Sequence, residues 1–224
     1  MDATINVENL TKEFKLSISK SGFIGSITTL FSRKYRIIKA INDISFKINQ
    51  GEFVGYVGEN GAGKSTTIKI LTGILFPTSG KAVVNNIIPY KNRIENSKKI
   101  GVVFGQRSQL WWDLPVRDSF DLLKSIYKIP QNTFDKNIGL FIDILKINEF
   151  FDVPVRKLSL GQRMRCDLSA SLLHDPQILF LDEPTIGLDV IAKDKIRKFL
   201  AEINKEKKTT IILTTHDMDD IEEL

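Results

Sequence analysis

The chain has 224 residues, of which 42% are hydrophobic, and it carries a formal net charge of +5. This length and apolar content suit one sizeable packed domain, whereas the longest apolar runs fall far short of the roughly 18 residues that a membrane-spanning helix needs. Because the basic residues are scattered among acidic ones without an aromatic stacking pattern, we expect no nucleic-acid partner.

The chain has a single cysteine, Cys166, so it cannot form an internal disulfide. Its N-terminus also lacks a signal-peptide pattern. The cysteine content favours a reducing, cytoplasmic compartment, and we expect Cys166 to be a packed helix residue, with a reactive thiol as the alternative.

Strand and helix patterns alternate through the N-terminal half. An apolar run leads into a glycine-rich loop, a helix from about residue 63 to 74 follows the loop, and a proline-glycine turn leads to the next strand. The strands predicted here are Asn42–Ile48, Glu52–Val57, Lys81–Asn85 and Lys99–Phe104.

The segment Lys15–Lys39 interrupts this pattern with a short apolar patch among Lys and Arg residues. We expect a surface excursion that covers the edge of the sheet. Contact with a membrane surface or a partner protein is the alternative.

From about Val116 to His174 the apolar period becomes helical. Phe120, Leu123 and Ile126 share one predicted face, and another is formed by Phe134, Ile138, Phe141 and Leu145.

After this helical section the strand pattern returns. The remaining predicted elements are the strand Gln177–Asp182, the helix Val190–Lys205 and the strand Thr209–Thr215. This order predicts an α/β fold with a mainly parallel sheet and a helical subdomain inserted at about residues 107–175, with ligand at the carboxyl ends of the strands.

The glycine-rich loop, GENGAGKS over residues 58–65, fits G-x-x-x-x-G-K-[ST] in full. It follows a predicted strand and opens a helix, which is the context that makes this phosphate-binding motif specific. The backbone N–H groups and the helix N-terminus would face the phosphates, Lys64 would contact the β/γ oxygens and Ser65 would coordinate Mg²⁺. The predicted nucleotide-binding residues of this loop are Gly58, Asn60, Gly61, Gly63, Lys64, Ser65 and Thr66.

Two carboxylates, Asp182 and Glu183, end the buried apolar run ILFL. We expect Asp182 to hold Mg²⁺ and Glu183 to orient or deprotonate an attacking water. A solvated turn before Pro184 is the alternative.

The two histidines have different predicted roles. His216 ends a later strand, so it would lie at the same sheet edge as the carboxylates, where we expect a γ-phosphate contact. His174 precedes Asp175-Pro176, and we expect it to be structural at a helix end.

Four elements in this order, the phosphate loop, LSLGQ at Leu158–Gln162, ILFLDE and His216, resemble the nucleotide-binding subunit of an ABC transporter. The resemblance covers nearly the whole chain. FGQRSQLWWDLP together with LSLGQ is similar to the exporter-like cassettes that pair with ABC-2 type permeases.

The resemblance implies one ATPase domain over residues 1–224, with a RecA-like core of the P-loop NTPase type, a small antiparallel β subdomain and a helical subdomain. It implies ATP and Mg²⁺ as cofactors, a second ATP-binding subunit in a head-to-tail homodimer, and integral-membrane permease subunits that hold the chain at the inner face of the cell membrane. Since the family pattern usually continues past His216 with another strand and more helix, we expect the C-terminal end to be truncated.

The same resemblance implies roles for single residues. Gln106 is the Q-loop glutamine that senses Mg²⁺ and the permease, and Asp189 belongs to the D-loop. Phe14 stands where such cassettes place an aromatic that stacks on adenine, with a core role as the alternative. Trp111 and Trp112 either face the permease or pack within the helical subdomain.

The turn LSLGQ, which we call the signature turn, has a local and a functional interpretation. Ser159 and Gln162 form a capping box that starts a helix. A capped helix N-terminus also attracts anions, so Ser159, Gly161 and Gln162 would meet the γ-phosphate of ATP held by another subunit, as the resemblance implies. Leu160 stands where the common family motif, LSGGQ, has its first glycine.

Two other functional classes are less well supported by the residues. A soluble ABC-type ATPase that acts as a nucleotide-dependent clamp on ribosomes or DNA would have tandem cassettes or a long coiled coil between Lys64 and Ser159, and neither is present. A binding module without turnover would lack Glu183 or His216, and both are present.

Overall fold

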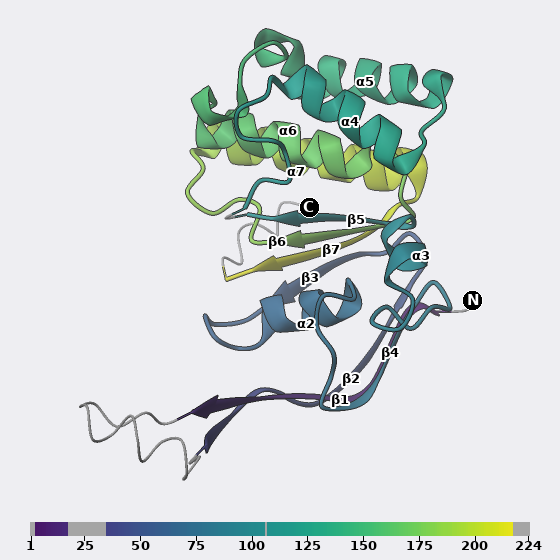
Figure 1. Ribbon diagram of the computed structural model, residues 1–224, viewed down its shortest axis with the longest axis vertical. Coiled ribbons are helices and arrows are strands. Elements are labelled where there is room, and N and C mark those ends of the chain that lie inside the picture. Colours follow the sequence, from purple (N-terminus) through teal and green to yellow (C-terminus); the bar gives the residue numbers. More distant parts are fainter. Residues whose placement is uncertain (1–2, 18–34, 106, 217–224) are drawn as a thin grey trace, which may run out of the picture.

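The computed structural model describes residues 3–17, 35–105 and 107–216. It contains two sheets, one antiparallel and one parallel, with helices between them and above them (Figure 1). The parallel sheet with helices on both of its faces is the α/β architecture that the order of elements predicts.

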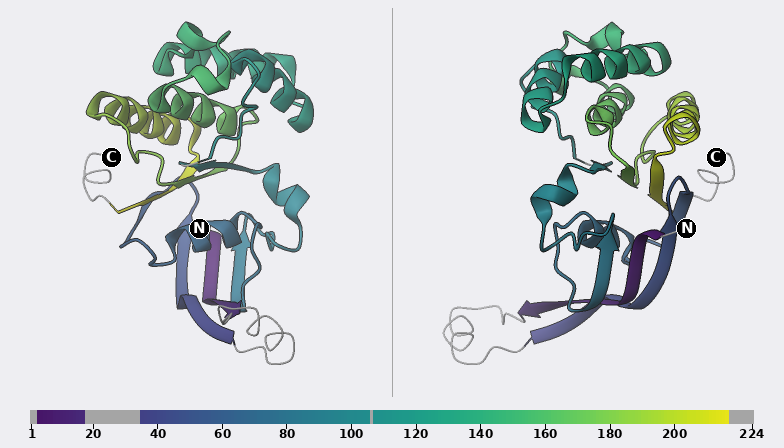
Figure 2. Two further views of the ribbon diagram at one scale, coloured as in Figure 1. Left: turned by 60° about the vertical axis from the view of Figure 1, so that its left-hand side comes forward. Right: turned by 90° about the vertical axis from the view of Figure 1, so that its right-hand side faces the viewer.

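The antiparallel sheet has the strand order β2-β1-β4 (Figure 2). Its strands are β1 (Ala3–Ser17), β2 (Tyr35–Asn49) and β4 (Ser79–Val84). The β1–β2 pairing continues to Ser17 opposite Tyr35, whereas the β1–β4 pairing ends with Thr11 opposite Ser79. Residues 15–17 and 35–39 thus extend two strands, and the prediction of a surface excursion is wrong for them; residues 18–34 lie outside the described part of the chain.

The parallel sheet has the order β3-β7-β6-β5. Its strands are β3 (Phe53–Val57), β5 (Ile100–Phe104), β6 (Ile178–Asp182) and β7 (Thr210–Thr215), each of which begins one residue later than predicted. The run ILFL on β6 is buried at every position because both faces of the sheet are covered.

The core below the parallel sheet contains α2 (Lys64–Leu71), which lies between the two sheets (Figure 1). Ile178 and Phe180 of β6 pack here with Ile68 of α2 and Val7 of β1. The helix ends at Leu71, three residues earlier than predicted, and Gly73 has a φ of 80° that takes the chain out of helical geometry.

The core above the parallel sheet takes the alternate β6 residues, Leu179 and Leu181, because successive strand side chains point to opposite faces. The helices over this face are α4 (Val116–Tyr127), α5 (Gln131–Leu145), α6 (Leu160–Leu172) and α7 (Val190–Lys207), with 3-10 turns at Ile147–Phe150 and Val155–Lys157. A short helix before β5, α3 (Arg93–Ser97), lies on the side of α2, where Asn96 donates to the Leu71 carbonyl oxygen. In Figure 1, α6 and α7 lie next to the sheet, and α4 and α5 form the outer layer.

The face predicted for α4 is partly wrong. Phe120 and Leu123 are buried, but Ile126 is 62% exposed. Tyr127 instead turns inward and stacks on His174, with the ring centroids 4.1 Å apart. The His174 Nε2 atom lies 3.0 Å from the Ile100 carbonyl oxygen, and burial lowers the pKa of the ring. His174 is structural as predicted, but as a stacked neutral ring and not as a charge at a helix end.

Two further sequence predictions concern packing and the membrane. Cys166 is fully buried in α6, and burial raises the pKa of its thiol, so it is the packed helix residue expected. Among the residues that the structure describes, no helix combines the length and apolarity needed to cross a membrane.

Candidate functional site

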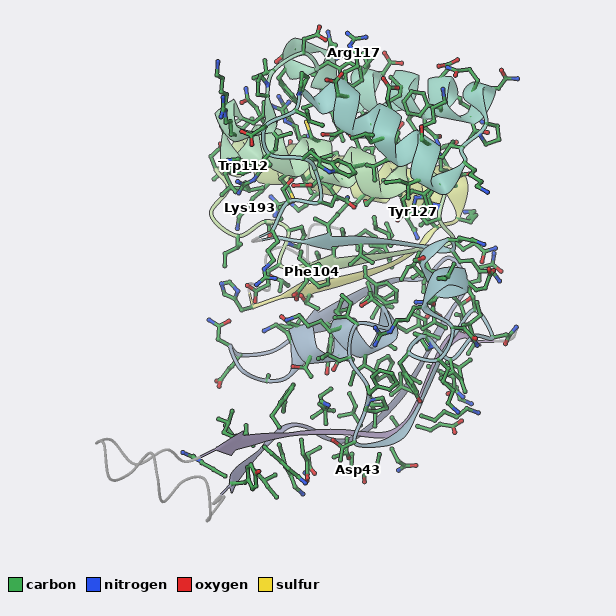
Figure 3. The ribbon with its side chains drawn as sticks, in the orientation of Figure 1. Asp43, Phe104, Trp112, Arg117, Tyr127 and Lys193 are labelled. Atoms are coloured by element: carbon green, nitrogen blue, oxygen red, sulfur yellow. The ribbon has the colours of Figure 1, made fainter. Side chains whose placement is uncertain are left out.

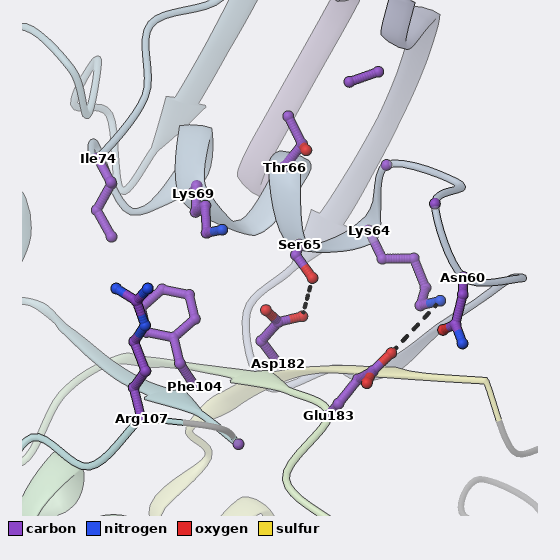
Figure 4. Close-up of a pocket in the computed structure, with 14 residues that line it drawn as sticks. Asn60, Lys64, Ser65, Thr66, Lys69, Ile74, Phe104, Arg107, Asp182 and Glu183 are labelled. Carbon is purple, nitrogen blue, oxygen red and sulfur yellow. Dashed lines mark hydrogen bonds and ion pairs between the residues drawn. The ribbon is translucent and has the colours of Figure 1, made fainter. Parts of the chain in front are cut away.

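A pocket of about 540 Å³ opens at the carboxyl ends of the parallel strands (Figure 4). The phosphate loop and α2 form one wall, and the ends of β5 and β6 form the other. Its lining includes these residues predicted from the sequence: Asn60, Gly61, Gly63, Lys64, Ser65, Thr66, Asp182 and Glu183. The fold thus brings the loop and the two carboxylates together around one space.

The phosphate loop depends on Gly63 at the start of α2. Gly63 has a φ of 92°, and a Cβ there would lie 2.2 Å from the Ala40 carbonyl oxygen. Any larger residue would therefore be strained and would push against β2. This close approach fixes the loop against the antiparallel sheet, and Ala40 itself lines the pocket.

Lys64 is 5% exposed, although it carries a charge. Its Nζ donates to the carbonyl oxygens of Gly58 at 2.5 Å and Glu59 at 3.0 Å, and it lies 3.9 Å from Glu183 Oε1. The ammonium group is therefore held at the pocket wall between the loop and an acidic partner. A phosphate entering the pocket would meet a positioned, largely desolvated cation.

Asp182 accepts two hydrogen bonds at one oxygen. Ser65 Oγ donates to Asp182 Oδ1 at 2.9 Å, and Thr214 Oγ1 donates to the same atom at 2.7 Å. A hydroxyl and a carboxylate are hard oxygen donors of the kind that Mg²⁺ prefers. The donor set at this point of the pocket fits that ion.

Glu183 stands at a sharply constrained backbone position. Its φ is 52°, and its N–H donates to the Thr214 carbonyl oxygen at 3.1 Å. Gly105 N donates to the Asp182 carbonyl oxygen at 2.8 Å, and a Cβ on Gly105 would lie 2.1 Å from the Glu183 carbonyl oxygen. The ends of three neighbouring strands thus hold Glu183 in place.

His216 lies beside Glu183 but does not line the main pocket. Its Nδ1 is 3.7 Å from Glu183 Oε1, and the two residues line a smaller cavity of about 90 Å³. The histidine therefore shares the sheet edge with the carboxylates, as its position at the end of β7 predicts.

The signature turn has the predicted capping box. Gln162 N donates to Ser159 Oγ at 3.2 Å, and Ser159 N donates to Gln162 Oε1 at 2.9 Å. The Leu160 side chain packs against Gly187, with one methyl 3.1 Å from where a Cβ of Gly187 would stand. Asp189 caps α7 by accepting from Ala192 N at 2.8 Å. The signature turn and the D-loop thus pack on each other.

Several predicted nucleotide-binding residues are not in the lining of the 540 Å³ pocket. Gly58 contributes only the carbonyl that accepts from Lys64. Phe14 is on β1 opposite Ile38, with Lys12 Nζ 5.0 Å from its ring centroid. The other four are Ser159, Gly161, Gln162 and Asp189. Gln106 lies outside the described residues.

Six residues that line the pocket were not predicted from the sequence: Ala40, Lys69, Ile74, Phe104, Gly105 and Arg107. Thr214, which donates to Asp182, was also missed. A threonine pair at the end of the apolar run of β7 was a signal for Thr214, because hydroxyls at the carboxyl edge of a parallel sheet have few apolar neighbours there. The role of Gly105 depends on a contact with residue 183, which no local pattern reveals.

A second polar cluster lies on α6, where Asp167 is 3% exposed. Ser108 Oγ and Gln109 N donate to Asp167 Oδ1 at 2.8 and 3.0 Å, and Gln109 Nε2 donates to the Asp167 carbonyl oxygen at 2.8 Å. Burial raises the pKa of Asp167 from 3.8 to about 6, although the Ser108 and Gln109 hydrogen bonds oppose the shift. Ionised Asp167 therefore destabilises the fold at neutral pH.

We expect Asp167→Asn to change how stability depends on pH. Between pH 4 and 6 the folded chain binds more protons at Asp167 than the unfolded chain does, so wild-type stability falls as pH rises through this window. Asn cannot ionise. The unfolding free energy of the variant minus that of the wild type should rise by on the order of 2 to 3 kcal/mol from pH 4 to pH 8, as measured by urea denaturation.

Asp152→Asn is the matched control, because Arg117 lowers the pKa of this exposed carboxyl by a hydrogen bond. A lowered pKa stabilises the fold above the ordinary value, so the same difference should fall slightly with rising pH. A flat profile for Asp167→Asn would contradict the raised pKa.

Trp111 and Trp112 are 39% and 53% exposed, so they are not packed within the helical layer. Trp112 lies at the end of that layer nearest the carboxyl ends of the parallel strands, whereas Tyr127 lies at the opposite end (Figure 3). The Arg163 guanidinium is 5.7 Å from the Trp112 ring centroid. The pair forms an apolar surface next to the signature helix α6.

Residues 41–186 match the family model described as ABC transporter. The chain is 30% identical over 194 residues to the ABC transporter ATP-binding protein NatA of Bacillus subtilis (strain 168). This match covers 87% of this chain and 78% of NatA. It is 32% identical to the bacitracin transport ATP-binding protein BcrA of Bacillus licheniformis, over 88% of this chain and 63% of BcrA. It spans only 26% of the ABC transporter A family member 8 of Dictyostelium discoideum, at 36% identity over 97% of this chain.

Solved structures show the same fold. The dimeric post-hydrolysis state of the ATP-binding cassette MJ0796 bound to ADP and Pi has a TM-score of 0.77 at 27% identity, and the match covers 98% of this chain and 90% of that one. CbiO1 from Clostridium perfringens, part of the ABC transporter complex cbiONQ, has a TM-score of 0.75 at 30% identity, covering 99% of this chain and 81% of that one.

Proposed function

Because the chain belongs to the ABC transporter family, we propose that it binds and hydrolyses ATP and that this hydrolysis powers export through a separate membrane permease. One observation carries the catalytic part of the proposal. A buried Lys64 in a complete phosphate loop faces Glu183, beside the Ser65–Asp182 pair. This arrangement would bring phosphate binding, cation binding and base catalysis together in one pocket.

In the proposed mechanism the loop amides and Lys64 hold the β- and γ-phosphates. Ser65 and Asp182 would hold Mg²⁺, which when bound neutralises charge on the phosphates. A γ-phosphate near Lys64 would compete with Glu183 for the ammonium group, 3.9 Å from Oε1 without nucleotide. Glu183 would then be available to orient and deprotonate the attacking water.

Further residues take supporting roles in the proposal. His216, 3.7 Å from Glu183, would contact the γ-phosphate, and Phe14 would stack on adenine. Gln106, next to the strand end that Gly105 fixes, would sense Mg²⁺ and the permease. Thr66 would add a donor at the loop.

The proposal includes a second copy of the chain. Ser159, Gly161, Gln162 and Asp189 are not in the lining of their own pocket, and Ser159 is exposed at a helix N-terminus, where anions are favoured. Two chains in head-to-tail contact would place each signature turn on the ATP of the other. The dimeric MJ0796 cassette supports this arrangement.

Export through an ABC-2 type permease is supported by the stretch FGQRSQLWWDLP and by the named relatives NatA and BcrA. The exposed Trp111–Trp112 pair supports the permease as the partner, because exposed aromatics at the centre of an interface contribute strongly to binding. The permease would hold the chain at the inner face of the membrane.

The permease is tested by purifying the tagged chain from detergent-solubilised membranes of its own cells. We expect an integral-membrane protein to co-purify, and Trp111→Ala/Trp112→Ala to lower its recovery at least about tenfold, since truncating interface aromatics costs about 2 kcal/mol or more. Ile126→Ala is the control, because Ile126 is 62% exposed and lies near the end of α4 that is far from the pair. Recovery of ribosomes or DNA in place of a membrane protein would contradict the proposal and favour a soluble clamp.

A further inference from the structure

Hydrogen bonds hold the chain just before and just after residue 106. Before it, Gly105 N donates to the Asp182 carbonyl oxygen at 2.8 Å. After it, Ser108 Oγ and Gln109 N donate to Asp167 Oδ1. Only two residues, 106 and 107, separate the catalytic sheet edge from this attachment to the signature helix.

A cavity of about 100 Å³ lies between residues 107–109 and β5, lined by Val102, Val103, Phe104, Arg107, Ser108, Gln109 and Asp167. Because side chains next to a void make fewer packing contacts, the hydrogen bonds to Asp167 contribute to holding residues 108 and 109 in place. An apolar side chain at 167 would leave the Ser108 hydroxyl and the Gln109 amide without this acceptor.

The attachment continues toward the exposed tryptophans. Leu110 N donates to Ser108 Oγ at 3.1 Å, and Trp111 N donates to the buried Ser119 Oγ at 3.3 Å. Arg156 N donates to the Trp112 carbonyl oxygen at 3.0 Å, just before the signature turn. Hydrogen bonds therefore tie residues 108–112 to the middle of α6, to α4 and to the turn before the signature turn.

We propose that Asp167 is a positioning residue for ATP hydrolysis: it fixes residues 107–109, which follow the catalytic edge of the sheet, and makes the signature helix move together with the segment 108–112. A movement of the Trp111–Trp112 surface would then be transmitted to Ser159 and to the site of Glu183 through the hydrogen bonds of residues 108 and 109 to Asp167. The inference rests on the proposed function for the reaction that Asp167 positions.

The test measures steady-state ATP hydrolysis by the isolated chain. Asp167→Ala should lower kcat at least about tenfold, because a misplacement of about 1 Å in a catalytic arrangement costs up to about 100-fold. The KM for ATP should change less than about threefold, since the phosphate loop is not touched. Asp167→Asn should keep at least about half of kcat, because its amide oxygen can accept both hydrogen bonds.

Asn137→Ala separates positioning from general destabilisation. Asn137 is 2% exposed and ties α5 to the end of α6 by donating to the Leu173 carbonyl oxygen at 3.0 Å, beyond Asp167 along the helix. It should lower the melting temperature as Asp167→Ala does, with kcat within about twofold of wild type. Asp167→Ala with unchanged kcat, or with a loss equal to that of Asn137→Ala, would overturn the inference.

Hydrogen exchange gives a readout that needs no turnover. The amides of residues 108–110 should exchange at least about tenfold faster in Ser108→Ala, a smaller change that keeps the charge, and not in Asn137→Ala. Unchanged exchange would overturn the inference even if Asp167→Ala failed to fold. A wild-type chain without ATPase activity but with the expected exchange pattern would instead refute the proposed function alone.

Discussion

Glu183→Gln is expected to lower the kcat for ATP hydrolysis by about 100-fold or more, because it removes the proposed general base, whose contribution is typically of that size. The pocket should otherwise persist. Glutamine is isosteric, and the backbone of residue 183 is held by its bond to Thr214 and by its contact with Gly105.

ATP binding should survive in this variant, with an affinity equal to or higher than that of the wild type. The Glu183 carboxylate lies 3.9 Å from Lys64 Nζ, so its charge would compete with the γ-phosphate for that cation. Gln removes the competitor. Fluorescent-nucleotide titration should therefore give a Kd equal to or below that of wild type, and ATP-bound dimers should accumulate in size-exclusion chromatography with Mg²⁺.

Glu202→Gln is the control of the same chemistry on the exposed side of α7, away from the pocket. It should leave kcat and Kd unchanged. Undiminished hydrolysis by Glu183→Gln would show that another group activates water, and a loss of ATP binding would show that the carboxylate holds the pocket together.

The nucleotide half of the site was predictable because its signals are local. The phosphate loop, its strand and its helix are contiguous in the sequence. The unbroken apolar run of β6 predicts a buried strand that ends at the two carboxylates. Parallel pairing then places the end of β6 against the loop, so the 2.9 Å contact of Ser65 with Asp182 follows from topology.

What escaped prediction depends on contacts between distant segments. Gly105 matters because a strand end passes 2.1 Å from where its Cβ would be, and Asp167 matters because residues 108 and 109 lie over α6. In the sequence Asp167 is one polar residue in an amphipathic helix. The burial of Asp167 could not be inferred from the sequence, because residues 108 and 109, which cover it, are distant in the chain.

The extended β1–β2 hairpin escaped prediction for a different reason. Its outer residues Leu16, Tyr35, Ile37 and Ile38 are exposed apolar side chains that lack the in-out alternation of a half-buried strand. Periodicity reports burial, and this ladder is not buried, so a strand held by backbone pairing alone gives no alternating pattern.

Two inactive variants should restore hydrolysis when they are mixed, if the signature turn of one chain completes the ATP site of another. Lys64→Ala removes the buried cation from the phosphate loop, and Ser159→Arg places a bulky charge at the exposed start of α6. Each homodimer should have less than about 1% of wild-type activity, because both of its sites are damaged.

A mixed dimer of these variants has one site with both faults and one site with neither. The intact site combines the Lys64 loop of the Ser159→Arg chain with the signature turn of the Lys64→Ala chain. With random pairing half of the dimers are mixed, and each has one working site of two, so the mixture should recover about a quarter of wild-type activity if the sites act independently.

Lys64→Ala mixed with Glu183→Gln is the decisive control. Lys64 and Glu183 lie 3.9 Å apart in the same chain, so every pairing leaves each site without one of them, and no activity should return. Recovery in the first mixture and none in the second would locate Ser159 on the opposite half-site from Lys64 and Glu183. Full activity of Ser159→Arg alone, or no recovery in either mixture, would contradict a site shared between two chains, because only a shared site makes faults at Lys64 and Ser159 complementary.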